Sequence, residues 1–337
     1  MIRYVPVIRS DAATGVVREI YAQIDHELGL VAPTFVAHSG TPEILAELWS
    51  VTRQTQLVGE EPRVLKEAVA AVVSRINACS FCLDAHSMML KAANQHQAAT
   101  LIAAAREATV ADLGLRDILR WAAATRTPDH PLVRMPPFSI EERPEIVATA
   151  LRFHYLNRVA TILLDPSPLP RMFRSGLLRA LGMKLGARRF AAAMTHPRRA
   201  AEPVSGQVPP DGLRWAARAP HIVRAFLRFG AVVESAAEEA VDHVTRALVT
   251  ARVARWQGED MPLSRSWVEA EIAGLDPDAR PAARLALLTA LAPHQVDAST
   301  VASFVRPRTD GARRLLPLLA WASLVAAQRV GSWLTAA

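Results

Sequence analysis

Residues 67–86 read EAVAAVVSRINACSFCLDAH, and this stretch determines how the middle of the first half of the chain folds. Over residues 65–76, apolar side chains recur at three- and four-residue intervals, which is the spacing of an amphipathic helix. The dipeptide at 77–78 is a suitable place for a turn, and Cys79 or Ser80 can cap a second helix. The stretch therefore predicts two antiparallel helices that meet at the cysteines.

The chain has only two cysteines in 337 residues, and they form a Cys-x-x-Cys pair. His86 follows Cys82 by four residues, so on a helix the imidazole and this thiol share a face. Glu67 precedes Cys79 by a distance of about 18 Å if the helix is continuous. Glu67 can therefore join the pair only if the chain reverses direction between them.

This pattern indicates thiol redox chemistry. A thiol in the first turn of a helix feels the positive end of the dipole, and an adjacent imidazole can take its proton; both effects lower the pKa of cysteine. Glu67 would orient and charge-balance His86. The helix start favours Cys79 as the attacking sulfur and His86 favours Cys82; we favour Cys82, because the base acts in a specific direction. The alternative is a pair of buried structural cysteines.

Residues 76–86, together with Glu67, resemble the signature of the alkylhydroperoxidase D-like family, which also contains the carboxymuconolactone decarboxylases. Residues 31–44 resemble the helix that opens the domain of this family, and residues 155–160 resemble the Asn-Arg helix that closes it. The resemblance covers roughly residues 15–165 and implies a helical bundle. The catalytic residues that it implies are Glu67, Cys79, Cys82 and His86.

The resemblance also implies a thiol-dependent peroxidase or disulfide reductase that uses no cofactor. Cys82 would attack the peroxide, Cys79 would form a disulfide with it, and an external dithiol would restore the pair. The implied donor is a lipoyl-bearing protein or a similar small dithiol, and the implied assembly is a homo-oligomer. Phe81 departs from the pattern, because well-known peroxidases of the family have a second histidine there. This departure argues against a proton relay to Cys79, but not against a relay from Glu67 through His86 to Cys82.

The composition predicts an all-α protein. Glycine is sparse, with 15 residues, and no alternating strand pattern is present. The net charge of +7 comes from an arginine-rich chain in which arginine commonly occupies solvated faces, so we expect no nucleic-acid partner. The N-terminal residues lack an apolar signal region, and the longest apolar run, residues 315–327, is too short to span a bilayer. These features predict a cytoplasmic protein without a membrane partner.

The sequence also predicts neither a cofactor nor a metal. No glycine-rich phosphate loop is present, so no nucleotide or flavin site is expected. A zinc site built from Cys79, Cys82 and His86 would need a fourth ligand or a water, and the chain has no second Cys-x-x-Cys pair. His38 and His154 could line a thiol pocket, but histidines at such positions are more often structural.

The chain length predicts two domains. Proline-rich breaks divide the chain into a catalytic alkylhydroperoxidase D-like domain at 1–165, a basic linker at 166–210, and a degenerate helical repeat of the first domain at 211–337. The repeat rests on weak matches: residues 42–44, 67–69 and 157–159 recur at 220–222, 239–241 and 328–330. In this register the two cysteines and the histidine fall on Ala251, Ala254 and Gly258. The chain would then have one active site.

The linker has a strongly basic stretch at 171–199 that allows two interpretations. Its arginines could contact an anionic surface or a nucleic acid. Alternatively, it forms a helix docked by its apolar side, with the arginines in water. We favour the docked helix, whose predicted apolar side consists of Met172, Phe173, Leu177, Leu178, Leu181 and Leu185.

Two further functions compete with the peroxidase. A lyase acting on a lactone acid would need a cationic clamp for a carboxylate, for which Arg75 or Arg158 could serve, but true decarboxylases of the family generally lack the cysteine pair. A redox-sensing or interaction module without catalysis is the second alternative. Asp84, between Cys82 and His86, should turn away from both on a helix, and we expect it to be solvated.

Overall fold

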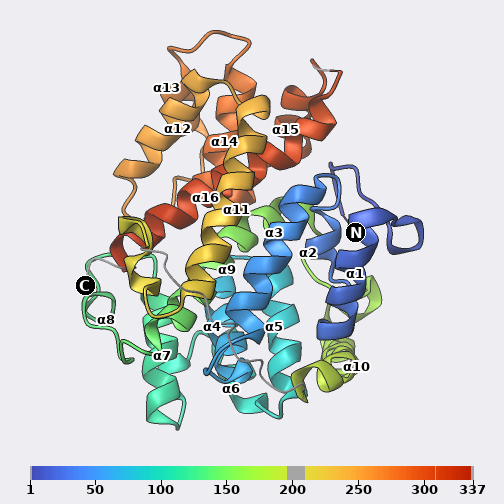
Figure 1. Cartoon of the computed structure of the whole chain (residues 1–337), viewed down its shortest axis with the longest axis vertical. Coiled ribbons are helices and arrows are strands. Elements are labelled where there is room, and N and C mark those ends of the chain that lie inside the picture. Colours follow the sequence, from blue (N-terminus) through green and yellow to red (C-terminus); the bar gives the residue numbers. More distant parts are fainter. Residues whose placement is uncertain (1, 196–208, 308, 335–337) are drawn as a thin grey trace.

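The computed structural model describes residues 2–195, 209–307 and 309–334, and over these ranges it consists of helices and loops without a named strand (Figure 1). Ile2 and Leu164 form an isolated bridge. The helices are α1 (Gly15–Leu28), α2 (Pro33–Val36), α3 (Pro42–Thr52), α4 (Arg63–Ile76), α5 (Ser80–Ala92), α6 (His96–Ala103), α7 (Leu113–Ala124), α8 (Pro131–Arg134), α9 (Arg143–Leu163), α10 (Gly176–Thr195), α11 (Pro220–Ala240), α12 (His243–Arg255), α13 (Ser266–Ile272), α14 (Arg280–Leu291), α15 (Ala298–Val305) and α16 (Gly311–Leu334). The prediction of an all-α fold is confirmed.

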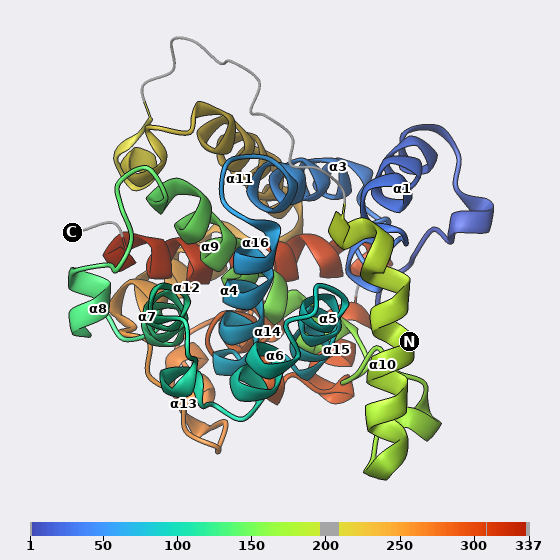
Figure 2. The ribbon, with the colours of Figure 1, turned by 90° about the horizontal axis from the view of Figure 1, so that it is seen from below.

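Helix α9 packs against helices from both halves of the chain, which surround it in the view of Figure 2. Pro144 occupies its first turn, where the missing N–H of proline has no intrahelical partner to lose. Nearly all of its side chains are buried, as expected for a helix enclosed on every side. Helices α4 and α5 pack on it from the first half and α16 from the second, so both halves share one buried apolar cluster.

The stretch with the cysteines folds as the predicted helical hairpin. Helix α4 ends at Ile76, and Ala78 has a φ of +54°, a left-handed conformation that allows the chain to reverse. Helix α5 begins immediately afterwards, with Cys79 as its N-cap residue. Because α4 and α5 pack against each other, Glu67 and His86 come together from two different helices.

The predicted duplication is not confirmed by the arrangement of helices. Two of its matches fall on comparable elements: α3 and α11 both begin at a proline, Pro42 and Pro220, and Asn157 and Gln328 both lie in long helices, α9 and α16. The third does not, because Glu67 lies inside α4 whereas Glu239 lies in the last turn of α11. The positions assigned to the cysteines lie near the end of α12, whereas the cysteines themselves begin α5. The division into three regions stays a prediction.

Helix α10, in the basic linker, packs against α5 through a different face from the one predicted. The buried cluster beneath it consists of Met88, Leu169, Met183, Ala187 and Phe190. Leu178, Leu181 and Leu185 are exposed, so the prediction that these leucines dock the helix is wrong. Apolar side chains occur all round α10, and their spacing therefore does not identify the docked face. Arg198 and Arg199 of the basic stretch lie outside the described residues.

Asp84 is buried, which corrects the expectation of a solvated side chain. The hydroxyl of Ser167 donates a hydrogen bond of 2.6 Å to its carboxylate, and Arg179 of α10 forms an ion pair with it. The spacing on one helix correctly turned Asp84 away from Cys82 and His86, but it could not show that the linker folds back over that face. The contacts of Asp84 therefore hold the linker on α5, beside the cysteines.

Helix α16 is long and apolar enough to cross a membrane by its length and composition, and no other helix of the described ranges meets this test. In the folded chain, 78% of the apolar window is buried inside the protein. It packs mainly against α9, α11 and α14, so in this structure α16 is a helix of the core.

Arg126 connects the second half of the chain to the turn that precedes the cysteines. Its guanidinium donates hydrogen bonds of 2.9 Å to the carbonyls of Ile76 and Gly258, and it lies 5.7 Å from the ring centre of Trp256. Gly258 has a φ of +90°, and a Cβ atom there would lie 1.7 Å from the carbonyl oxygen of Arg126. This junction therefore requires glycine for both its backbone conformation and its lack of a side chain.

We expect the Gly258→Ala substitution to lower the free energy of unfolding by about 2 kcal/mol or more, because it forces both a left-handed alanine and a backbone clash. Urea denaturation followed by circular dichroism measures this change. Gly274→Ala is the matched control, since a Cβ atom at Gly274 meets no atom within 4 Å, and it should change stability by less than about 0.5 kcal/mol. Equal effects of the two substitutions would contradict the proposed tight junction.

Candidate active site

The central contact of the site is a hydrogen bond between the side chains of Glu67 and His86. Nδ1 of His86 lies 2.6 Å from Oε2 of Glu67, and both residues are buried. An ionised carboxylate can only accept hydrogen bonds, so Nδ1 must be the nitrogen that carries the proton. In the neutral imidazole, Nε2 is then left unprotonated and can accept a proton from another group.

Glu67 is ionised although it is fully enclosed. Burial alone would raise the pKa of its carboxyl group, but the hydrogen bond and charge of His86, the charge of Arg63 and a hydrogen bond from Gln56 hold this pKa at about 2. Nε of Arg63 lies 3.2 Å from the second carboxylate oxygen. The glutamate and the histidine could be predicted from the sequence, whereas the arginine one helical turn earlier on α4 was not.

Cys79 lies at the start of α5, where the predicted effect of the helix terminus is present. Its sulfur accepts a hydrogen bond of 3.4 Å from the backbone N–H of Cys82. Two asparagines hold the turn before it: Asn77 donates to Oδ1 of Asn157 at 3.1 Å, and Asn157 donates to the hydroxyl of Ser74 at 3.0 Å. Because Asn157 belongs to α9, the central helix fixes the position of the first thiol.

The protein shifts the pKa values of the two thiols in opposite directions. Burial raises the pKa of Cys82 well above its usual range, and the neighbouring sulfur of Cys79 raises it further. Burial also acts to raise the pKa of Cys79, but hydrogen bonds from Cys82 and from Asn157 outweigh it and lower the pKa below its usual value. Cys79 is therefore the more acidic of the two thiols, and Cys82 keeps its proton to higher pH.

A small cavity of about 80 Å³ brings the second thiol together with the histidine. Its wall includes Glu67, Phe81, Cys82, His86, Arg152 and Phe153. Cys79 is not part of this wall, so of the two sulfurs Cys82 is the one that faces the space. Phe81, the position where the family signature has a histidine, contributes an apolar side chain to it. The cavity is large enough for the –O–OH group of a peroxide or for a few water molecules.

Arg152 is a site residue that was not predicted from the sequence. It lies on α9, 5% exposed, and donates a hydrogen bond to Oε1 of Gln56. Burial lowers the pKa of Arg152 to about 10, so it still carries a positive charge at neutral pH. Its guanidinium lies 4.2 Å from the ring centre of Phe153, and the rings of Phe153 and His86 pack edge to face with their centres 4.5 Å apart. No sequence motif singles out Arg152, because its partners come from other helices.

The remaining candidate residues lie outside this cavity. His38 is a buried structural histidine, hydrogen-bonded to the carbonyl of Thr34 and the hydroxyl of Tyr155. His154 is fully buried as well. The two arginines considered as carboxylate clamps have other partners: Arg75 pairs with Glu107 at 2.6 Å, and Arg158 donates to the carbonyl of Ala290 at 2.8 Å.

Comparison with known proteins gives one full-length relative. An alkyl hydroperoxide reductase of Mycobacterium tuberculosis (strain ATCC 25618 / H37Rv) is 35% identical over 337 residues, which cover 100% of this chain and 96% of that protein. No family model matches the chain, and no solved structure matches it. The similarity extends through the linker and the second half of the chain, well beyond the part that carries the signature residues.

The pKa of Cys79 should lie below that of an ordinary cysteine, and the pKa of Cys82 above it. We expect the Cys82→Ser variant, which retains Cys79, to form thiolate at lower pH than the Cys79→Ser variant, which retains Cys82. The helix N-terminus stabilises the first thiolate, whereas burial opposes the second. Thiolate absorbance near 240 nm as a function of pH measures both, with the double serine variant as the blank. The reverse order of titration would contradict this assignment.

Glu67 should make the stability of the protein depend on pH in the acidic range. Its pKa is lowered from 4.5 to about 2 on folding, so its contribution is complete above the unfolded pKa and is lost as the pH falls toward the folded one. Between these values the wild type should lose up to about 3 kcal/mol more than Glu67→Gln, which has no carboxylate to protonate. Urea denaturation from pH 5 to pH 2 tests this, and parallel curves for the two proteins would refute it.

Proposed function

The chain belongs to the alkylhydroperoxidase D-like family, and we propose that it reduces organic hydroperoxides through the thiols of Cys79 and Cys82. Its similarity to an alkyl hydroperoxide reductase supports a peroxide-reducing role in general. The observation that carries the specific proposal is the hydrogen bond between Glu67 and His86 in the wall of a cavity that Cys82 also lines. A base, an orienting carboxylate and a thiol that meet at one space have the composition of an activated nucleophile.

In the first step, Nε2 of His86 takes the proton of the Cys82 thiol, directly or through a water. The thiolate attacks the terminal oxygen of the hydroperoxide; an S–O bond forms as the O–O bond breaks, so sulfur is oxidised and the peroxide is reduced. The alkoxide that leaves takes the proton from His86 and departs as the alcohol. Arg152 in the cavity wall supplies a positive charge beside the atoms on which negative charge develops.

In the second step, the Cys79 thiolate attacks the sulfenic acid of Cys82; an S–S bond forms as the S–O bond breaks, and the hydroxide that leaves takes up the proton that the Cys79 thiol released, giving water. The lower pKa of Cys79 suits it to this role, because the resolving sulfur must act as a thiolate. An external dithiol then reduces the disulfide by thiol–disulfide exchange and is itself oxidised. Family resemblance supports a lipoyl-type dithiol as the donor and a homo-oligomer as the working form.

Steady-state reduction of cumene hydroperoxide with dihydrolipoamide tests this proposal. We expect turnover by the wild type, loss of turnover in Cys82→Ser, and a fall of about 100-fold or more in His86→Ala, the usual scale for a lost general base. His96→Ala is the matched control, because it removes an exposed histidine on the neighbouring helix α6. It should retain the wild-type rate.

A wild type without turnover, although both thiols react with a thiol reagent, would overturn the peroxidase proposal. Slow oxidation of the thiols without turnover by any dithiol would then favour the redox-sensing module. A peroxidase activity that survives in Cys82→Ser but disappears in Cys79→Ser would retain the function and exchange the roles of the two sulfurs.

A further inference from the structure

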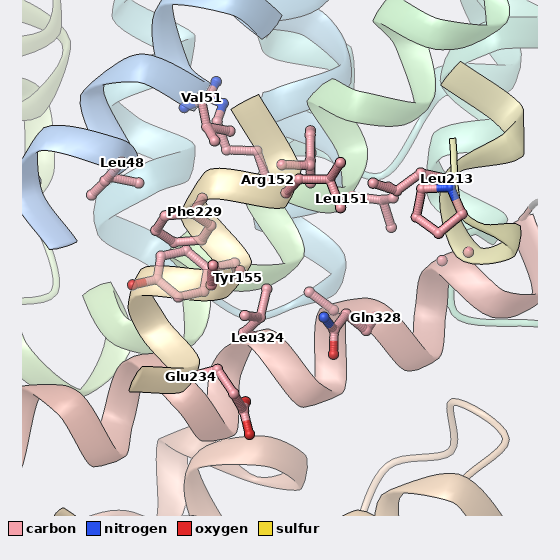
Figure 3. A pocket seen from close by; sticks show the side chains of 18 of the residues that line it. Leu48, Val51, Leu151, Arg152, Tyr155, Leu213, Phe229, Glu234, Leu324 and Gln328 are labelled. Atoms are coloured by element: carbon pink, nitrogen blue, oxygen red, sulfur yellow. The ribbon is translucent and has the colours of Figure 1, made fainter. Parts of the chain in front are cut away.

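Arg152 also lines a second and much larger cavity. It has a volume of about 620 Å³, within the range of roughly 300–1,000 Å³ that is usual for small-molecule sites. Figure 3 shows its lining, with α3, α9, α11 and α16 contributing side chains around one space. The cavity is therefore built from both halves of the chain, whereas the thiol site belongs to the first half.

The lining of this cavity is predominantly apolar. Among its residues are Leu48, Leu151, Tyr155, Phe226, Phe229 and Leu324. The few polar groups, such as Glu234 and Gln328, are seen toward α16 in Figure 3, away from the Arg152 label. A space of this kind favours a hydrocarbon over a polar or charged ligand, because burial of apolar surface supplies the binding energy.

Arg152 connects the two cavities. Its side chain lines the large apolar space and also the small space that contains Cys82 and His86. Burial lowers the pKa of Arg152 only to about 10, so its guanidinium is positively charged at neutral pH. A ligand oxygen placed between the two cavities would lie beside this charge, which favours an oxygen on which negative charge develops.

We propose that the large cavity holds the hydrocarbon chain of an alkyl hydroperoxide whose –O–OH group reaches past Arg152 to Cys82. This inference rests on the proposed function and names its substrate class, a linear hydroperoxide of medium or long chain. The positively charged guanidinium of Arg152 lies beside the oxygen that bears the alkyl chain, the atom that becomes the alkoxide when Cys82 attacks. The second half of the chain, which lacks cysteines, thereby determines which peroxides the first half reduces.

Gly230 of α11 offers a way to fill the cavity without disturbing its backbone. It lines the space, and a Cβ atom at this position meets no atom within 4 Å. The neighbouring Ala231 is exposed at the same cavity and can be enlarged as a second, independent variant. Ser235→Leu is the matched control, because Ser235 is an exposed residue of the same helix outside the lining.

The test compares kcat/KM for decyl hydroperoxide and for tert-butyl hydroperoxide in the full-length protein. We expect the wild type to prefer the decyl compound at least tenfold. Gly230→Leu and Ala231→Leu should lower kcat/KM for decyl hydroperoxide at least tenfold and change it less than twofold for tert-butyl hydroperoxide. Ser235→Leu should change neither. An unaltered preference in both cavity variants, with circular dichroism showing that they are folded, would overturn the proposal.

The product analogue 1-decanol separates this proposal from the peroxidase function, because its binding requires no thiol chemistry. Calorimetry should show that it binds the wild type, and that it binds Gly230→Leu at least tenfold more weakly. With the wild type it should inhibit turnover of decyl hydroperoxide competitively. Binding of 1-decanol without any peroxide turnover would refute the proposed function and retain the hydrocarbon site. Absence of binding, or noncompetitive inhibition, would overturn the hydrocarbon site.

Discussion

The buried, ionised carboxylate of Glu67 is the constraint on which the rest of the site depends. An enclosed carboxylate is destabilising unless hydrogen bonds and opposite charges compensate for its loss of water. His86, Arg63 and Gln56 provide them, from α5, from α4 itself and from the short π-helical segment at Arg53–Leu57 that extends α3. Arg63 also donates a hydrogen bond of 2.6 Å to a carbonyl of α10. The contacts that balance the charge of Glu67 thus also hold the π-helical segment, α5 and α10 around the thiols.

Helix α9 connects the thiol site to the second half of the chain through its side-chain contacts. On one side its Asn157 holds the turn before Cys79, and its Arg152 lines the cavity of Cys82. On another side Arg158 reaches a carbonyl of α14 and lies 5.7 Å from the ring centre of Trp256. A helix that is buried on all faces cannot move without disturbing both sets of contacts, because protein interiors are closely packed. The position of the thiols therefore depends on residues far away in the sequence.

The sequence was informative where the relevant interactions are local. The hairpin of α4 and α5 could be predicted, because helical spacing, a turn and a capping residue all lie within 20 residues, and the pairing of Glu67 with His86 follows from that reversal. Arg152 could not be predicted, since its role arises only when α9 packs between the two cavities. The face by which α10 docks was predicted wrongly for a related reason. Apolar side chains occur all round this helix, so their spacing does not select a face. The contacts with Asp84 and Arg63, which come from other parts of the chain, select it. The duplication rested on a few identities, and the helix boundaries do not reproduce its register.

In the proposed mechanism, the opposite pKa shifts of Cys79 and Cys82 limit which oxidants can react with the thiols. A low-pKa thiolate that faced solvent would react with any oxidant or electrophile, whereas Cys79 is kept out of the cavity wall and is stabilised by the start of α5. Cys82 faces the cavity but is held protonated by burial and by Cys79. It becomes a nucleophile only when His86 removes its proton, and the alkoxide that would recover this proton forms only from a peroxide already inside. When the Cys82 thiolate attacks, its sulfur becomes part of a neutral sulfenic acid. The same step therefore consumes the peroxide and ends the cost of a buried negative charge. In the proposed mechanism, reactivity is thereby confined to molecules that fit the space beside Arg152, and the walls of the two cavities, more than the thiols themselves, determine specificity.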